Sequence, residues 1–321
     1  METFYILFKN IRIQGANAIS SPITYGFPSV GGFVGAMHAL QRRLPENMPL
    51  QFNGVLIACR KCTPRIFREH AFSDASFIHT RNPVGKDGKT AAIIEEGKVD
   101  LTVSLVIEAH SDNGNAIRNN IHHTQQQLSH LLIQQRSAGG SVMNIGTVQI
   151  FNTSGKSLDN NQYLISQLLP SYILTDASDE LPEIVAELQA DNPQATALDA
   201  LFSTAQIFHI PPENETGKWQ TKSIKTGRGW LVPIPVGYQA IADEIPAGKL
   251  QNCRNPEYSA RFVESVYSLG KWVFPLSCQD NWQQHFWSFR QPENHNGNTL
   301  YRYATDYASG KNDDNSTTDY F

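Results

Sequence analysis

The sequence predicts an α+β protein, and the patterns of its two halves lead to this prediction. The first half alternates strand-like and helix-like stretches in the order strand, helix, strand, strand, helix, strand. The second half carries helical patterns at 158–168, 179–190 and 197–206 but few clean strand patterns. The order in the first half is that of the ferredoxin-like fold, which RNA-recognition (RRM-like) domains share. We therefore expect a ferredoxin-like core with large insertions and an irregular C-terminal portion.

Each element of this core is predicted from its own pattern. The expected elements are a strand over 3–13, a helix over 29–44, strands over 54–59 and 99–107, a helix from Asn115 to the glycines at 139 and 140, and a strand over 141–151. Ser29 suits a helix N-cap, and the strand at 99–107 alternates as if one face were buried. In the second half, Pro233 and Pro235 lack an N–H group, so 229–237 is expected at an edge or as an extended segment.

The same patterns predict how the chain is divided. We expect a ferredoxin-like core over 1–155 with an irregular excursion at 64–98, then a helical and irregular portion over 156–310 that packs on the core. The polar stretch 311–321 is expected to be a disordered tail.

Composition excludes several classes of protein. A net charge of −4 argues against a free-standing, nonspecific nucleic-acid binder, although a local basic pocket remains compatible with it. Four cysteines are too few for a disulfide scaffold, and the chain has neither a membrane-length apolar run nor a signal peptide, so we expect a cytoplasmic protein without membrane contact.

The Gly-Lys-Thr and Gly-Lys-Ser fragments lack the earlier glycine of a phosphate loop, and Cys59 and Cys62 form a lone CxxC. No cofactor, metal site or catalytic residue is predicted.

Two stretches carry residues suited to a single-stranded nucleic acid. The loop before the first helix offers Asn17 and Ser20 for base edges and Tyr25 and Phe27 for stacking, although the two aromatics could equally pack in the core. The stretch 136–141 offers an arginine and exposed backbone N–H groups for an oxyanion, although its glycines could simply cap the helix.

Several segments together resemble one family, the second subunit of the type I-F CRISPR surveillance (Csy) complex. They include ANAISSPITYGFPSVGGFVGAMHALQRR, TRNPVGKDGKTAAIIEEG, SAGGS, GWLVPIPVGYQAI, RFVESVYSLGKW and LYRY, in this order, from about residue 13 to 304. The resemblance implies a non-catalytic, ferredoxin-like RNA-binding protein that caps the five-prime handle of the CRISPR RNA. It also implies pairing with the large subunit, contact with the first backbone subunit, and contact with target DNA only through the complex.

The RNA-binding residues are predicted from these stretches and from the resemblance together. They are Asn17, Ser20, Tyr25 and Phe27 for bases, Arg42, Arg43, Arg81 and Arg136 for phosphates, and Gly139, Gly140 and Ser141 for backbone contacts. Two alternatives stay open. One is a metal-independent endoribonuclease that processes repeat RNA with His79 as its acid or base. The other is a scaffold that touches only protein.

Overall fold

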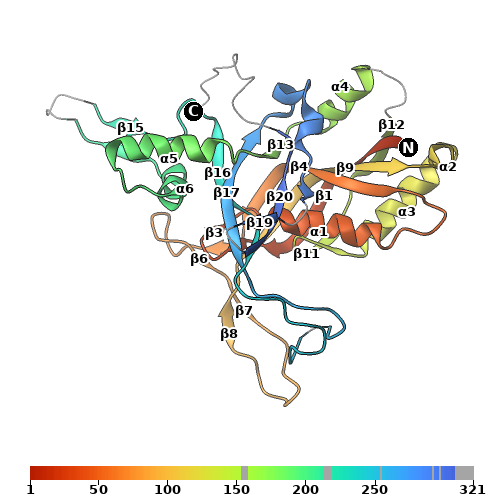
Figure 1. The fold of residues 1–321 in the computed structure, drawn as a ribbon, viewed down its shortest axis with the longest axis horizontal. Helices are drawn as coiled ribbons and strands as arrows, with labels where there is room; N and C mark the ends of the chain where they lie inside the picture. The colour runs from red at the N-terminus through yellow and green to blue at the C-terminus, as the bar shows by residue number, and fades with distance from the viewer. Residues whose placement is uncertain (153–157, 213–217, 254, 291–292, 296–297, 308–321) are drawn as a thin grey trace. The chain divides into compact units, whose positions relative to one another are not determined.

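The structure is a computed structural model of mixed α/β class, in which a curled antiparallel sheet is combined with several helices. It describes all residues except 153–157, 213–217, 254, 291–292, 296–297 and 308–321. The chain divides into two compact units, Met1–Tyr172 (unit 1) and Ile173–Phe321 (unit 2) (Figure 1). The predicted domain limit at 155 and the predicted tail 311–321 lie outside the described residues.

The sheet of unit 1 is built around its first strand. Its main strands are β1 (Glu2–Asn17), β4 (Gln51–Pro64), β9 (Lys98–Ser111), β10 (Arg136–Ser137), β11 (Gly140–Asn144) and β12 (Thr147–Asn152). The sheet order is β10-β11-β1-β9-β4, with β12 also on β1, and all of these pairs are antiparallel. Ile107 lies opposite both Ile6 and Val55, and all three are buried. Register shifts in β1 after Phe8 and Ile13 add the local twist that bulges bring.

The middle of β9 corrects the prediction of a single buried face. Val103, Leu105 and Ile107 are buried as expected, but Ser104 and Val106 on the opposite face are buried too. Ser104 can be buried because its hydroxyl accepts a hydrogen bond from the backbone N–H of Asn10 at 3.1 Å. A polar residue in an alternating pattern therefore does not always mark a solvent face.

The helices of unit 1 follow the prediction at one position and depart from it at another. They are α1 (Val30–Gln41), α2 (Gly114–Asn119), α3 (Ile121–Ile133) and α4 (Leu158–Gln167). The helix predicted over 29–44 is confirmed as α1, which begins after Ser29 and buries Phe33, Met37 and Leu40. The helix predicted from Asn115 is interrupted at Asn120, whose φ and ψ of −122° and 28° are not helical, and it ends at Ile133. It does not reach the glycines, because residues 136–141 form a hairpin.

Short two-stranded ribbons occupy the loops of unit 1. They are β2 (Ile19–Ser21) with β3 (Thr24–Tyr25), β5 (Ile66–Phe67) with β6 (Ser76–Phe77), and β7 (His79–Arg81) with β8 (Ile93–Glu95). The last two lie in the stretch 64–98. Phe67 and Phe72 are largely exposed there.

The strands of unit 2 pair as a regular sheet, which corrects the prediction of an irregular C-terminal portion. Its strands are β13 (Tyr172–Asp176), β16 (Trp230–Ala240), β17 (Val263–Val273), β18 (Ser288–Phe289), β19 (Glu293–His295) and β20 (Asn298–Ala304). They pair antiparallel in the order β13-β17-β16-β20-β18, with β19 also on β20. Glycine and proline interrupt β16 and β17, so neither strand shows a clean alternation in the sequence.

The two prolines of β16 show how a central strand can tolerate them. We expected 229–237 at an edge, but β16 lies between β17 and β20. Pro233 and Pro235 pair with β17 alone, while β20 pairs with β16 only from Gly237 to Gln239. The missing N–H groups therefore fall where only one side of the strand is paired.

The helices of unit 2 agree with the sequence, and two tryptophans fill part of its core. The helices are α5 (Glu180–Asp191), α6 (Ala197–Ala205) and the 3₁₀ turns η1 (Pro275–Cys278) and η2 (Trp282–His285). The apolar cluster under α5 and α6 contains Ile184, Leu201 and Leu269. Trp282 and Trp287 are fully buried, and the indole N–H of Trp287 donates to the carbonyl of Leu174 at 2.8 Å. No helix in the described part of the chain has the length and apolar character needed to cross a bilayer.

Candidate nucleic-acid interface

The glycines at 139 and 140 belong to a tight hairpin rather than to a helix cap. β10 and β11 are joined through Ala138 and Gly139, whose backbone φ values are 49° and 81°. Positive φ at both central residues is typical of the type I′ turn that fits the twist of a two-residue hairpin. The turn thus explains Gly139, and the alternative interpretation of this glycine as a helix C-cap is wrong.

This turn lies against the end of β1. The backbone N–H of Asn17 donates to the carbonyl of Ala138 at 3.0 Å, and the N–H of Ala138 donates to the carbonyl of Gly32 in α1 at 3.3 Å. A Cβ atom on Gly139 would lie 2.8 Å from the Asn17 side chain, and one on Gly140 would lie 2.7 Å from the backbone nitrogen of Ala16. Only glycine allows the two segments to approach this closely.

Two cations and a carboxylate gather at the same place. The guanidinium of Arg136 donates to the carbonyl of Gly139. Lys98 Nζ lies 3.4 Å from Asn17 Oδ1 and 2.6 Å from Glu96 Oε1. The hydrogen bond from Lys98, followed by one from Thr80, lowers the pKa of Glu96, and the charge of Arg136 adds to this effect. We call Asn17, Lys98, Arg136 and the turn 138–141 the glycine-turn site.

The glycine-turn site presents donors suited to phosphate oxygens. Asn17, Arg136 and Ser141 are exposed, and they supply an amide, a guanidinium and a hydroxyl. Guanidinium and ammonium groups make charge-assisted hydrogen bonds to phosphate, which are about twice as strong as neutral ones. Five predicted residues meet here: Asn17, Arg136, Gly139, Gly140 and Ser141.

Lys98 and Glu96 were not predicted. Lys98 opens an alternating strand, and it reaches the site only because β1 and β9 pair with Asn17 opposite Lys98. The alternation of β9 could have placed Lys98 at a strand end, but the register with β1 is a tertiary property. The sequence signal that could have identified Lys98 is the presence of a basic residue at the end of a strand that is predicted to pair.

The ribbon after Asn17 holds two more of the predicted residues. Ser20 is half-buried, and its hydroxyl donates to the carbonyl of Thr24 at 3.2 Å and lies 2.7 Å from Thr24 Oγ1. Tyr25 is 72% exposed, and its ring lies nearly perpendicular to that of Phe77 at a centroid distance of 5.8 Å, so Phe77 covers at most one of its faces. Tyr25 therefore keeps an open ring face for stacking, whereas the Ser20 hydroxyl already has partners within the ribbon.

Phe27 packs inside unit 1. Its ring is stacked on that of the buried Phe33 in α1, with centroids 5.4 Å apart and an angle of 14° between the planes. One face of Phe27 is therefore already covered by the core. Its predicted role as a base-stacking residue stays a prediction.

Arg42 and Arg43 lie at the far end of α1. The 12 residues of α1 rise by about 18 Å, which separates these arginines from the contact between Ala138 and Gly32. Arg43 donates to the carbonyl of Leu131 at 2.9 Å and to Gln134 Oε1 at 2.7 Å. It borders a depression of about 440 Å³ that His123 and His130 also line. Arg43 thus lies at this depression, and Arg42 precedes it at the same end of α1.

Arg81 and His79 lie on the ribbon β7–β8. Both side chains are exposed. Glu95 lies opposite His79 in register, but its carboxylate accepts a hydrogen bond from the backbone N–H of Phe77 at 2.9 Å. The base of this ribbon reaches the glycine-turn site, because Thr80 donates to Glu96 at 3.0 Å.

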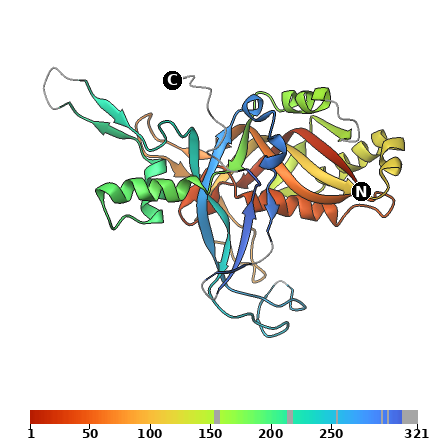
Figure 2. The ribbon, with the colours of Figure 1, turned by 45° about the horizontal axis from the view of Figure 1, so that its top comes forward.

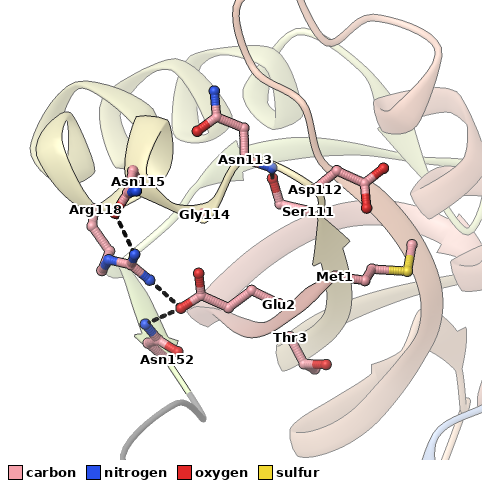
Figure 3. A pocket seen from close by; sticks show the side chains of 10 residues that line it. All are labelled: Met1, Glu2, Thr3, Ser111, Asp112, Asn113, Gly114, Asn115, Arg118 and Asn152. Carbon is pink, nitrogen blue, oxygen red and sulfur yellow. Dashed lines mark hydrogen bonds and ion pairs between the residues drawn. The ribbon is translucent and has the colours of Figure 1, made fainter.

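A larger depression of about 850 Å³ lies at the opposite end of β1, about 50 Å along a strand of 16 residues (Figure 3). Glu2 stands at its centre, and its carboxylate accepts hydrogen bonds from Arg118 and from Asn152. Glu2 and Arg118 inside this depression thus pair with each other, and none of the predicted residues lines it.

The two thiols of the CxxC sequence lie on β4. Burial raises the pKa of Cys59 to about 12, so this thiol stays protonated at neutral pH, whereas Cys62 is exposed on the same strand. Metal ligation needs the thiolate. Among the described residues, no three His, Cys, Asp or Glu side chains are grouped as metal ligands.

The fold and the glycine-turn site define a mixed α/β protein that gathers cationic and amide donors around a tight hairpin at the end of its central strand. The family model described as CRISPR-associated protein (Cas_Csy2) matches residues 6–303. The chain is 34% identical over 292 residues to the CRISPR-associated protein Csy2 of Pseudomonas aeruginosa strain UCBPP-PA14, covering 84% of this chain and 86% of the relative. The chain therefore belongs to the Csy2 family of CRISPR-associated proteins.

Proposed function

We propose that this chain is a non-catalytic subunit of the type I-F CRISPR surveillance complex, in which it caps the five-prime handle of the guide RNA. It pairs with the large subunit, abuts the first backbone subunit, and meets target DNA only through the assembled complex. Membership of the Csy2 family supports the complex. The observation that carries the RNA-binding role is the glycine-turn site, where Asn17, Lys98 and Arg136 meet beside a turn that only glycine permits.

We also propose that unit 1 is a ferredoxin-like core. Its elements follow the order β1, α1, β4, β9, α3 and β11 with β12. β11 and β12, which form the fourth strand of this order, lie beside β1. β1 lies beside β9, and β9 lies beside β4, and every pair is antiparallel. This order supports the ferredoxin-like assignment.

Exposed apolar side chains support the role as a subunit. Phe72 is fully exposed, and Phe67 in the same stretch of unit 1 is 61% exposed. Large apolar side chains that gather on a surface mark sites of interaction. We therefore expect the isolated chain to be less soluble than the chain with its partners.

The proposal is tested by co-expression with the large subunit and guide RNA, followed by binding of labelled handle RNA at two salt concentrations with EDTA present. Tight binding that depends on the handle, with intact RNA recovered, supports capping. If repeat RNA is cleaved cleanly and His79→Ala abolishes this cleavage, the chain is an endoribonuclease and the capping proposal is wrong. Assembly without any dependence on RNA would leave a protein scaffold.

Replacing Arg136 should weaken handle binding directly. Arg136→Ala removes one phosphate contact and the hydrogen bond to Gly139, so we expect affinity to fall about tenfold and the salt slope to shrink by about 0.7. Arg136→Lys keeps the charge and should keep the slope. The control is Arg68→Ala, an exposed arginine of unit 1 outside the site. Unchanged affinity and slope in Arg136→Ala would remove this residue from the interface.

Arg81 tests whether the ribbon β7–β8 takes part. Because Arg81 is exposed on this ribbon and the ribbon meets the glycine-turn site at Glu96, Arg81→Ala should weaken handle binding and reduce the salt slope by about one phosphate contact. Binding measured over a salt series, with Arg68→Ala outside the ribbon as control, gives both quantities. If affinity and slope match the unmodified chain, the ribbon does not contact the handle.

A further inference from the structure

Unit 2 carries a two-stranded ribbon that is not hydrogen-bonded to any larger sheet. β14 (Phe208–Ile210) pairs antiparallel with β15 (Gln220–Lys222) as a separate two-stranded sheet. In Figures 1 and 2 this ribbon extends outward past α5 and α6. Every side chain of both strands is exposed. Two-stranded hairpins of this kind are at best marginally stable in water, so a bound partner would stabilise this one.

The two faces of the ribbon combine aromatic and cationic side chains. Phe208 lies opposite Lys222, and both occupy one face. Trp219, next to β15, falls on the other face by alternation and is 66% exposed. His209 and Thr221 are paired there, with 3.4 Å between His209 Nδ1 and Thr221 Oγ1. Each face thus offers a ring beside a polar or charged group.

The charge of this segment differs from that of the whole chain. Residues 206–230 contain four cations (Lys218, Lys222, Lys225 and Arg228) and two carboxylates (Glu213 and Glu215), hence 4 − 2 = +2, against −4 for the chain. Arg228 is paired with Glu180 and Glu187. Lys218 and Lys222 have no ion pair within the part of the chain that the structure describes. The ribbon strands, residues 207–212 and 218–222, therefore carry two cations and no carboxylate, whereas the whole hairpin 207–222, which includes Glu213 and Glu215, has a net charge of 2 − 2 = 0.

This combination favours a nucleic-acid strand over a protein surface. Lysine is depleted in protein–protein interfaces, whereas single strands are bound by cations along the backbone and by aromatic rings under the bases. A narrow ribbon with a ring on each face can stack an unpaired base on either side.

We propose that the ribbon, residues 207–212 and 218–222, binds a single-stranded segment of the guide RNA other than the one that the glycine-turn site holds. This rests on the proposed function, which brings the guide RNA to the chain. Trp219 and Phe208 stack on bases, and Lys218 and Lys222 neutralise phosphates.

Photo-crosslinking in the co-purified complex, with thiouridine placed in the guide RNA, tests the position of the strand. The expected result is crosslinks from uridines outside the handle to residues 207–212 or 218–222. Crosslinks from handle uridines to 136–141 without any to the ribbon would overturn this proposal and leave the proposed function standing. The absence of crosslinks both to the ribbon and to 136–141 would contradict both this proposal and the proposed function. Crosslinks to the ribbon only from thiothymidine in target DNA, or burial of the ribbon by another subunit, would also overturn it.

Substitutions in the ribbon test whether its aromatic and lysine side chains bind RNA. Trp219→Leu keeps an apolar side chain but removes stacking, and we expect about a tenfold loss of guide-RNA affinity. Lys218→Gln with Lys222→Gln should reduce the salt slope by about 1.4, since each phosphate contact to a single strand contributes about 0.7. The matched controls in unit 2 are Tyr258→Leu and Lys249→Gln, both exposed. Equal effects in variants and controls would reject the ribbon as an RNA contact.

Discussion

Gly140→Ala should lower the free energy of unfolding by about 3 kcal/mol, the upper part of the range for overpacked sites. The added Cβ would lie 2.7 Å from the backbone nitrogen of Ala16 and 2.8 Å from the carbonyl oxygen of Gln14. Both contacts are backbone atoms of β1, so neither can rotate away. β11 would have to move from β1, which breaks the register of Gln14 with Ser141.

The same substitution should abolish handle binding, because it displaces the turn that holds Arg136 and Asn17 together. Urea unfolding of the full chain gives the stability, and the RNA titration gives the affinity. Gly35→Ala is the matched control. Gly35 is exposed within α1 with no atom within 4 Å of a Cβ, so alanine there should stabilise by about 0.5–1 kcal/mol. If Gly140→Ala is as stable as Gly35→Ala, the close approach of β1 and β11 is not a constraint.

The contrast between Gly35 and Gly140 shows which parts of the fold could be predicted from the sequence and which could not. The periodicity around Phe33 and Leu40 predicts α1, and the glycine at 35 is tolerated inside it. Gly139 and Gly140 could be singled out as special, but the sequence suggested a helix cap for them. A hairpin turn and a helix cap demand the same positive φ, and only the pairing of β10 with β11 distinguishes them.

The candidate site was predicted in part for a similar reason. Composition marks Tyr25 and Phe27 equally as aromatic loop residues, yet Tyr25 is exposed while Phe27 is stacked on Phe33. Arg43 and Arg136 look alike in sequence, yet Arg43 donates to Leu131 and Gln134 at the far end of α1. Residue type predicts which chemistry is possible, and tertiary contacts decide which side chains remain available for it.

The second large effect is a loss of stability of about 3 kcal/mol as pH falls from 6.5 to 4, caused by His285. His285 is fully buried, and its Nδ1 lies 2.8 Å from Thr175 Oγ1. Its ring packs on Tyr307, with 4.4 Å between the centroids. Burial lowers the pKa of His285 from 6.5 to about 4. The unfolded chain therefore takes up the proton first, so the stabilisation is complete above pH 6.5 and is lost as pH falls to 4.

Two buried carboxyl groups of unit 2 act in the opposite direction. Burial raises the pKa of Asp176 and of Glu180, so folding favours their protonated forms and gains stability as pH falls through their folded-state pKa values. The His285 effect must therefore be measured as a difference between variants. Urea unfolding between pH 7 and 4.5 should show a steep decline in the unmodified chain and a flatter one in His285→Asn, which cannot titrate.

His209→Asn is the matched control, because His209 is exposed on β14 of the same unit. It should leave the pH dependence as it is. A constant difference in stability between the unmodified chain and His285→Asn across this pH range would show that His285 is protonated in the folded protein as readily as in the unfolded one. That result would require water to reach its ring in the core of unit 2, beside Trp282 and Trp287.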